Sequence, residues 1–159
     1  MGGQTVYQKV IVPLDGSELA ECVLPHVETI AKGCAPQSIV FVRVVEPVRL
    51  PNVAEYSFSA RDIDRIESAE RLDAENYLKK VGSRYADKGW NVQTQLIKGV
   101  AADAIAEYAE KNGGDLIVIA THGRSGMSRW VWGSVADRVL HASCVPVLMV
   151  RAPGCVSGV

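Results

Sequence analysis

Runs of consecutive apolar residues along this chain alternate with segments in which apolar residues recur every three or four positions. The runs at residues 9–15, 38–45, 115–120 and 145–150 have the length and continuity of buried parallel strands. Residues 90–97 instead alternate between apolar and polar side chains, which is typical of a less buried edge strand. The pattern therefore predicts five strands.

The segment after the first strand predicts a helix that begins at Ser17, a residue type that caps helices. Pro25 lies inside this segment and predicts a kink, and Gly33 is a plausible end. The apolar stripe of this helix is formed by Leu19, Val23, Val27 and Ile30.

Three further helices are expected at about residues 61–88, at 101–111, and after residue 134. The first of them would end at Gly89, and the second at residues 112–114. The long helix would present one face made of Ile66, Ala74, Leu78, Val81 and Tyr85. The last helix is marked by Val135, Val139 and Leu140.

Alternation of strands and helices predicts an α/β fold: one doubly wound, five-stranded parallel sheet with helices on both faces and right-handed crossovers. We expect the strand order 3-2-1-4-5, in one domain over residues 1–159 with its core at about 8–151. In such sheets ligands bind at the carboxyl ends of the strands, where the order reverses. That edge would bring together the loops after the first and fourth strands.

Composition excludes several classes of function. The chain has 159 residues and a net charge of -1, so we expect no binding to nucleic acid or to an anionic membrane surface. It contains no apolar stretch of about 20 residues and no signal-peptide pattern, and we expect a cytoplasmic protein. The four cysteines lack zinc-site spacing, which favours free or buried thiols over a disulfide or metal site.

Two loops carry the candidate chemistry. Asp15, at the end of the first strand, could accept hydrogen bonds from ribose hydroxyls, or could cap the first helix. Gly123 and Gly126 would let the backbone approach a ligand, or would form a plain turn. Residues 133–134 open the last helix, whose free N–H groups suit phosphate oxygens, although Ser134 could also cap that helix without a ligand.

The segments KVIVPLDGS at 9–17, THGRSGMSRWVWGSVADRVL at 121–140 and VPVLMVR at 145–151 resemble the universal stress protein family. The resemblance covers nearly the whole chain. Nucleotide-binding members carry the motif G-x2-G-x9-G-[S/T]. Gly123, Gly133 and Ser134 match it, whereas Ala120 stands at the first glycine position.

The resemblance implies ATP binding, with Mg²⁺ carried by the phosphates. Asp15 would contact the adenosine, Val44 would pack on adenine, and the motif residues would lie along the ribose and phosphates. The full set expected to bind nucleotide is Pro13, Asp15, Val44, Ala120, Thr121, His122, Gly123, Arg124, Gly126, Gly133, Ser134 and Val135. The resemblance also implies a homodimer paired through the strand at 145–150, since an unpaired edge strand leaves backbone groups free.

No catalytic residues are predicted. His122 has no orienting partner in the sequence, and Arg124 could pair with phosphate or remain a solvated loop charge. We expect at most slow ATP hydrolysis in a nucleotide-responsive stress protein. The alternative is a dimeric interaction module with little or no nucleotide binding, which Ala120 favours slightly. A receiver-type domain is disfavoured, because Lys98 and Gly99 stand where it needs an aspartate.

Overall fold

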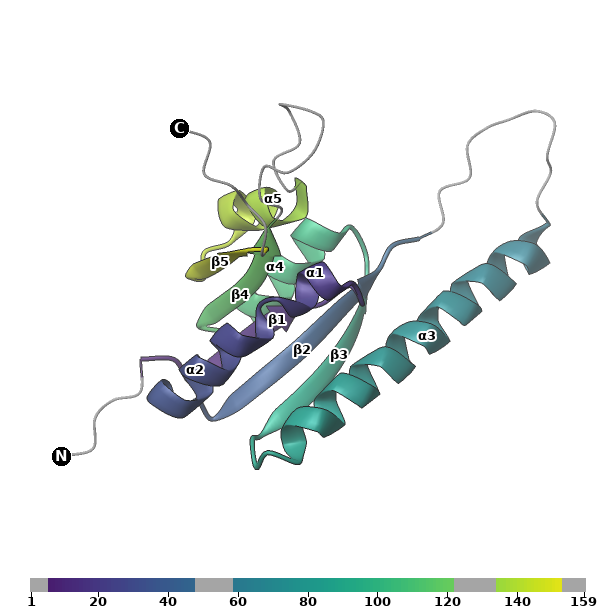
Figure 1. Ribbon diagram of the computed structural model, residues 1–159. Helices are drawn as coiled ribbons and strands as arrows, with labels where there is room; N and C mark the ends of the chain where they lie inside the picture. Colours follow the sequence, from purple (N-terminus) through teal and green to yellow (C-terminus); the bar gives the residue numbers. More distant parts are fainter. Residues whose placement is uncertain (1–5, 48–58, 122–133, 153–159) are drawn as a thin grey trace.

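The computed structural model describes residues 6–47, 59–121 and 134–152, which form a sheet with helices against both of its faces (Figure 1). Along the chain the elements are β1 (Lys9–Pro13), α1 (Glu18–Glu21), α2 (Leu24–Cys34), β2 (Ser38–Val45), α3 (Ala60–Ala86), β3 (Val92–Lys98), α4 (Ala101–Lys111), β4 (Leu116–Thr121), α5 (Ser134–Ala142) and β5 (Val147–Arg151). All five strands run parallel in the order β3-β2-β1-β4-β5. The expected fold and strand order are confirmed.

Side-chain alternation in β1 divides the core into two layers. Val10 and Val12 pack with α1, α2 and α3, whereas Ile11 packs with α4 and α5 on the opposite face. All three are fully buried, as expected for the centre of a doubly wound sheet. β3 and β5 are the two edges, and β3 is mostly exposed, as its alternating pattern predicts.

The segment after β1 forms two helices, so the expected single kinked helix is wrong. Ser17 caps α1 as predicted, and its Oγ accepts from the Ala20 amide at 3.1 Å. The chain then restarts as α2 with Pro25 in the first turn, where the missing N–H would have had no helical partner. α2 ends at Cys34, one residue beyond the expected Gly33, and its C-cap is Ala35, whose φ of 47° is left-handed.

α3 begins with a capping box, in which Ser59 and Asp62 each accept from the other's amide. Four residues of the expected apolar face are buried: Ala74, Leu78, Val81 and Tyr85. Ile66 is 44 % exposed, because the first half of α3 extends past the sheet (Figure 1). The prediction that Ile66 belongs to the packed face is therefore wrong.

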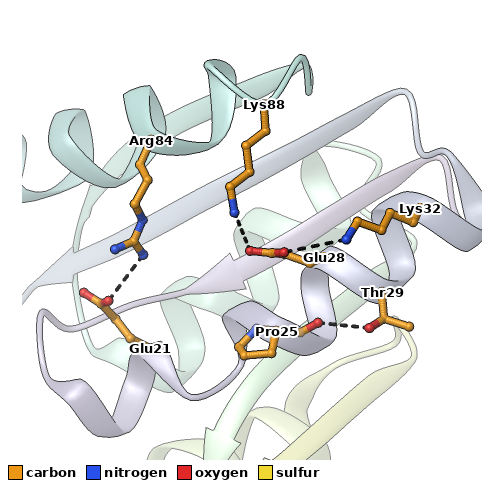
Figure 2. A network of polar contacts seen from close by, with 7 residues as sticks. All are labelled: Glu21, Pro25, Glu28, Thr29, Lys32, Arg84 and Lys88. Carbon is orange, nitrogen blue, oxygen red and sulfur yellow. Dashed lines mark hydrogen bonds and ion pairs between the residues drawn. The ribbon is translucent and has the colours of Figure 1, made fainter.

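Ion pairs connect α1 to α3, and α2 to the turn that follows α3, across the surface of this layer (Figure 2). Glu28 accepts from Lys88 at 2.6 Å and lies 4.0 Å from Lys32, while Glu21 pairs with Arg84 at 3.4 Å. The Glu21–Arg84 and Glu28–Lys88 pairs each join residues far apart in sequence. Within the described ranges, no helix has the length and apolarity that crossing a bilayer requires.

Candidate functional site

A cavity of about 190 Å³ opens at the carboxyl ends of β1 and β4, where the strand order reverses. Its walls come from strands β1, β2 and β4, from the turn after β1 and from the starts of helices α1, α4 and α5: Pro13, Leu14, Asp15, Leu19, Ala20, Val42, Val44, Ala101, Ile105, Ile119, Ala120, Val135 and Ala136. Asp15 is the one charged group among these lining residues, and the others are apolar. Such a surface suits a flat, largely apolar ring with a polar group at one end.

Five of the twelve predicted nucleotide-binding residues line this cavity: Pro13, Asp15, Val44, Ala120 and Val135. Thr121 ends β4 just beyond the lining, where its carbonyl accepts from the Ala152 amide at 3.2 Å. Ser134 begins α5. His122, Gly123, Arg124, Gly126 and Gly133 lie outside the described residues.

Several lining residues were missed by sequence reasoning. Val42 joins Val44 because alternate residues of β2 share a face. Ala101 and Ile105, one helical turn apart at the start of α4, form the facing wall, and Ala136 of α5 closes it. The alanine-rich start of α4 was the available signal, since small side chains leave room beside a sheet.

The turn after β1 fixes the backbone next to the Asp15 carboxylate. Asp15 Oδ1 accepts from the Ser17 amide at 2.8 Å, and Gly16 adopts a φ of 88°, which side-chain-bearing residues rarely tolerate. One carboxylate oxygen therefore holds the turn. Since a carboxylate can accept about four hydrogen bonds, Asp15 retains acceptor capacity for a ligand.

Tyr77 of α3 anchors α1 beside this turn. Its hydroxyl donates to Glu21 Oε1 at 3.0 Å. Burial, and then the negative charge of Glu21, raise the pKa of Tyr77 well above its ordinary value of 10.0. The hydroxyl therefore stays protonated at neutral pH and keeps donating to Glu21. Within the described part of the chain, no group of three or more His, Cys, Asp or Glu side chains could hold a metal ion.

The family profile of the universal stress protein family matches residues 6–151. Universal stress protein MJ0531 of Methanocaldococcus jannaschii is 36 % identical over 153 residues, covering 95 % of this chain and 86 % of that protein. Universal stress protein YxiE of Bacillus subtilis is 28 % identical over 148 residues, covering 92 % of this chain and all of that protein.

Solved structures share the fold. Protein MJ0577, also of M. jannaschii, superposes with a TM-score of 0.75 at 24 % identity, over 94 % of this chain and 99 % of that one. A universal stress protein in complex with cAMP gives a TM-score of 0.67 at 21 % identity, covering 92 % of this chain and 98 % of its own. An Arabidopsis thaliana protein with AMP bound gives 0.65 at 16 % identity, covering 92 % and 93 % respectively.

Proposed function

Because this chain belongs to the universal stress protein family, we propose that it binds an adenine nucleotide, ATP, in the cavity between β1 and β4. The observation that carries the proposal is the lining: an apolar slot with a single carboxylate at its mouth, at the switch point of a doubly wound sheet.

The base would lie between Val44 on the sheet and Ala101 and Ile105 on α4. The ribose would then reach Asp15, whose free acceptor capacity suits sugar hydroxyls. At about 190 Å³ the cavity is smaller than the roughly 300–1,000 Å³ of complete ligand pockets. It would therefore enclose the nucleoside and leave the phosphates outside it.

The phosphates would lie along the motif residues that precede α5, against Gly123, Gly126, Gly133 and the helix amino terminus at Ser134. His122, Arg124 and Thr121 would flank them. The cAMP and AMP complexes of two proteins with this fold support an adenine nucleotide as the ligand class. Mg²⁺ would be carried by the ATP phosphates and not by a carboxylate cluster of the protein.

We further propose that the protein acts as a nucleotide-responsive dimer in the stress response, paired through residues 145–150. β5 is an edge of the sheet, and an unpaired edge presents free backbone N–H and C=O groups to a second copy. Hydrolysis would be slow at most, because efficient phosphoryl transfer needs several positioned charges around the γ-phosphate, and Arg124 is the one Lys or Arg among the proposed nucleotide-binding residues.

Titration calorimetry with ATP and Mg²⁺ tests the site on wild type and Gly133→Asp. A new carboxylate beside the phosphates should weaken binding by about tenfold or more through like-charge repulsion. Gly33→Asp is the matched control, because a Cβ at Gly33 meets nothing within 4 Å and the residue is on the surface of α2.

Equal ATP affinity in wild type and Gly133→Asp would defeat the site assignment. The second candidate function, an interaction module with little nucleotide binding, is favoured by Ala120 at the first motif glycine. It predicts no measurable heat in any of the three proteins and no nucleotide released when purified protein is denatured.

A further inference from the structure

Arg43 is a charged residue on a strand that is otherwise apolar in its middle. It lies near the carboxyl end of β2, where Val42 and Val44 face the cavity. Alternation therefore turns residue 43 to the opposite face, the side on which Phe41 packs with α2 and α3. Central parallel strands are usually apolar on both faces, so a half-buried arginine here needs a physical explanation.

The Arg43 guanidinium packs against the turn that carries Asp15. A Cβ built at Gly16 would lie 3.3 Å from Nη1 and 3.7 Å from Cζ of Arg43, so the group rests directly on the turn backbone. The same Cζ lies 5.4 Å from the centroid of the Tyr77 ring, within cation–π range. Arg43 thus contacts the turn after β1 and a fixed aromatic ring of α3.

No hydrogen bond or ion pair engages the Arg43 guanidinium in the ranges 6–47, 59–121 and 134–152. The cost of half-burying this cation is offset by stacking, and arginine suits that role because its guanidinium is planar and more weakly hydrated than an ammonium. Tyr77 is itself held in place by its hydrogen bond to Glu21, which in turn pairs with Arg84. The ring is therefore a rigid support.

We propose that Arg43 is a positioning residue for the nucleotide site: its guanidinium, stacked on the Tyr77 ring, supports the Asp15–Gly16–Ser17 turn, so that Asp15 faces the cavity. This inference rests on the proposed function for its ligand. The ordering of the turn, however, is a property of the free protein, and the Ser17 amide that donates to Asp15 reports on it directly.

The first experiment compares Arg43→Met with wild type in two measurements: the solvent-exchange rate of the Ser17 amide by NMR without nucleotide, and the Kd for ATP by calorimetry. We expect Ser17 exchange to rise at least about fivefold and Kd to weaken about tenfold, the scale of a partly desolvated cation–π contact. Arg43→Lys should fall between wild type and Arg43→Met, because an ammonium can keep a cation–π contact with Tyr77 but does not stack as a plane on the turn.

Arg71→Met is the matched control, since Arg71 lies on the exposed side of α3 and pairs with Glu75 one turn away. It should match wild type in both measurements. A second pair of variants keeps Arg43 in place: Tyr77→Leu removes the ring and should reproduce the Arg43→Met effects. Tyr77→Phe keeps the ring and loses only its hydrogen bond to Glu21, so both effects should be smaller than in Tyr77→Leu.

Unchanged Ser17 exchange in Arg43→Met, or in Tyr77→Leu if Arg43→Met fails to fold, would overturn the proposal. Faster exchange with an unchanged Kd would overturn it as well, because the order of the turn would then not serve the ligand. If wild type itself binds no ATP, the proposed function fails, and Ser17 exchange still decides whether Arg43 orders the turn.

Discussion

Replacing Ala101 with leucine should stabilise the free protein and weaken its binding of ATP. Ala101 lines the cavity at the first turn of α4, facing Val44 of the sheet. Leucine adds three carbon atoms, which the cavity of about 190 Å³ can accept without displacing backbone. The leucine side chain would thus fill the space that we propose the ligand occupies.

The expected gain in stability follows from the three carbon atoms that the substitution buries. Three added carbons at about 0.8 kcal/mol each give about 2 kcal/mol, from which about 0.5–1 kcal/mol is lost as leucine rotamer entropy. The net gain of about 1–2 kcal/mol should raise Tm by about 2–8 °C for a chain of this size. The same side chain would occupy the place of the base, so ATP affinity should fall by about tenfold or more.

Thermal unfolding of the nucleotide-free protein and ATP calorimetry check the two effects separately. Ala69→Leu, at an exposed position of α3, is the control and should leave both values near those of wild type. A stabilised Ala101→Leu protein with wild-type ATP affinity would refute the placement of the base. A strongly destabilised one would show that the cavity is too small or too rigid to be filled.

Two further predictions concern stability. Gly114→Ala should lower the free energy of unfolding, measured by chemical denaturation, by about 1–3 kcal/mol, because a Cβ there would lie 2.7 Å from Ile11 Cγ1 in the core. Gly33→Ala is the control and should not destabilise the protein, because a Cβ at Gly33 meets nothing within 4 Å. Equal stability of the two variants would contradict this packing. The hydrogen bond from Lys88 lowers the pKa of Glu28 below its ordinary 4.5, so this pair should stabilise the fold above that pH and lose its contribution as the pH falls through the lowered value. Unfolding of Glu28→Gln at pH 7 and pH 3 should therefore show a smaller loss on acidification than wild type, and parallel losses would show that the pair contributes nothing.

The sequence predicted the sheet well because its signals are local and strong. The apolar run at 38–45 became β2 with the same bounds, and the alanine-rich segment at 101–111 became α4. Pro25 was interpreted as a kink, although a proline in a first turn is equally consistent with the start of a new helix. Whether the chain kinks or starts a new helix at Pro25 depends on how α1 packs against β4, and the periodicity of the sequence gives no information about that packing.

The end of α2 and the apolar face of α3 are two further features that periodicity alone did not predict correctly. Ala35, and not Gly33, takes the left-handed conformation after α2, and Ile66 fits the helical stripe of α3 but is 44 % exposed. At the site, Asp15 was predicted from its place at the end of the first strand and Val44 from the family resemblance, whereas Ala101 and Ile105 were not predicted. The alanine-rich start of α4 indicates only that there is room beside the sheet, and the structure is needed to show which apolar residues face the cavity.

The ligand's position is the most direct test of the account. A crystal structure of the protein grown with excess ATP and Mg²⁺ should show the base between Val44 and Ala101, with a ribose hydroxyl within hydrogen-bond distance of Asp15. A structure in which ATP binds elsewhere, or in which the protein's own side chains fill this cavity at saturating nucleotide, would contradict it.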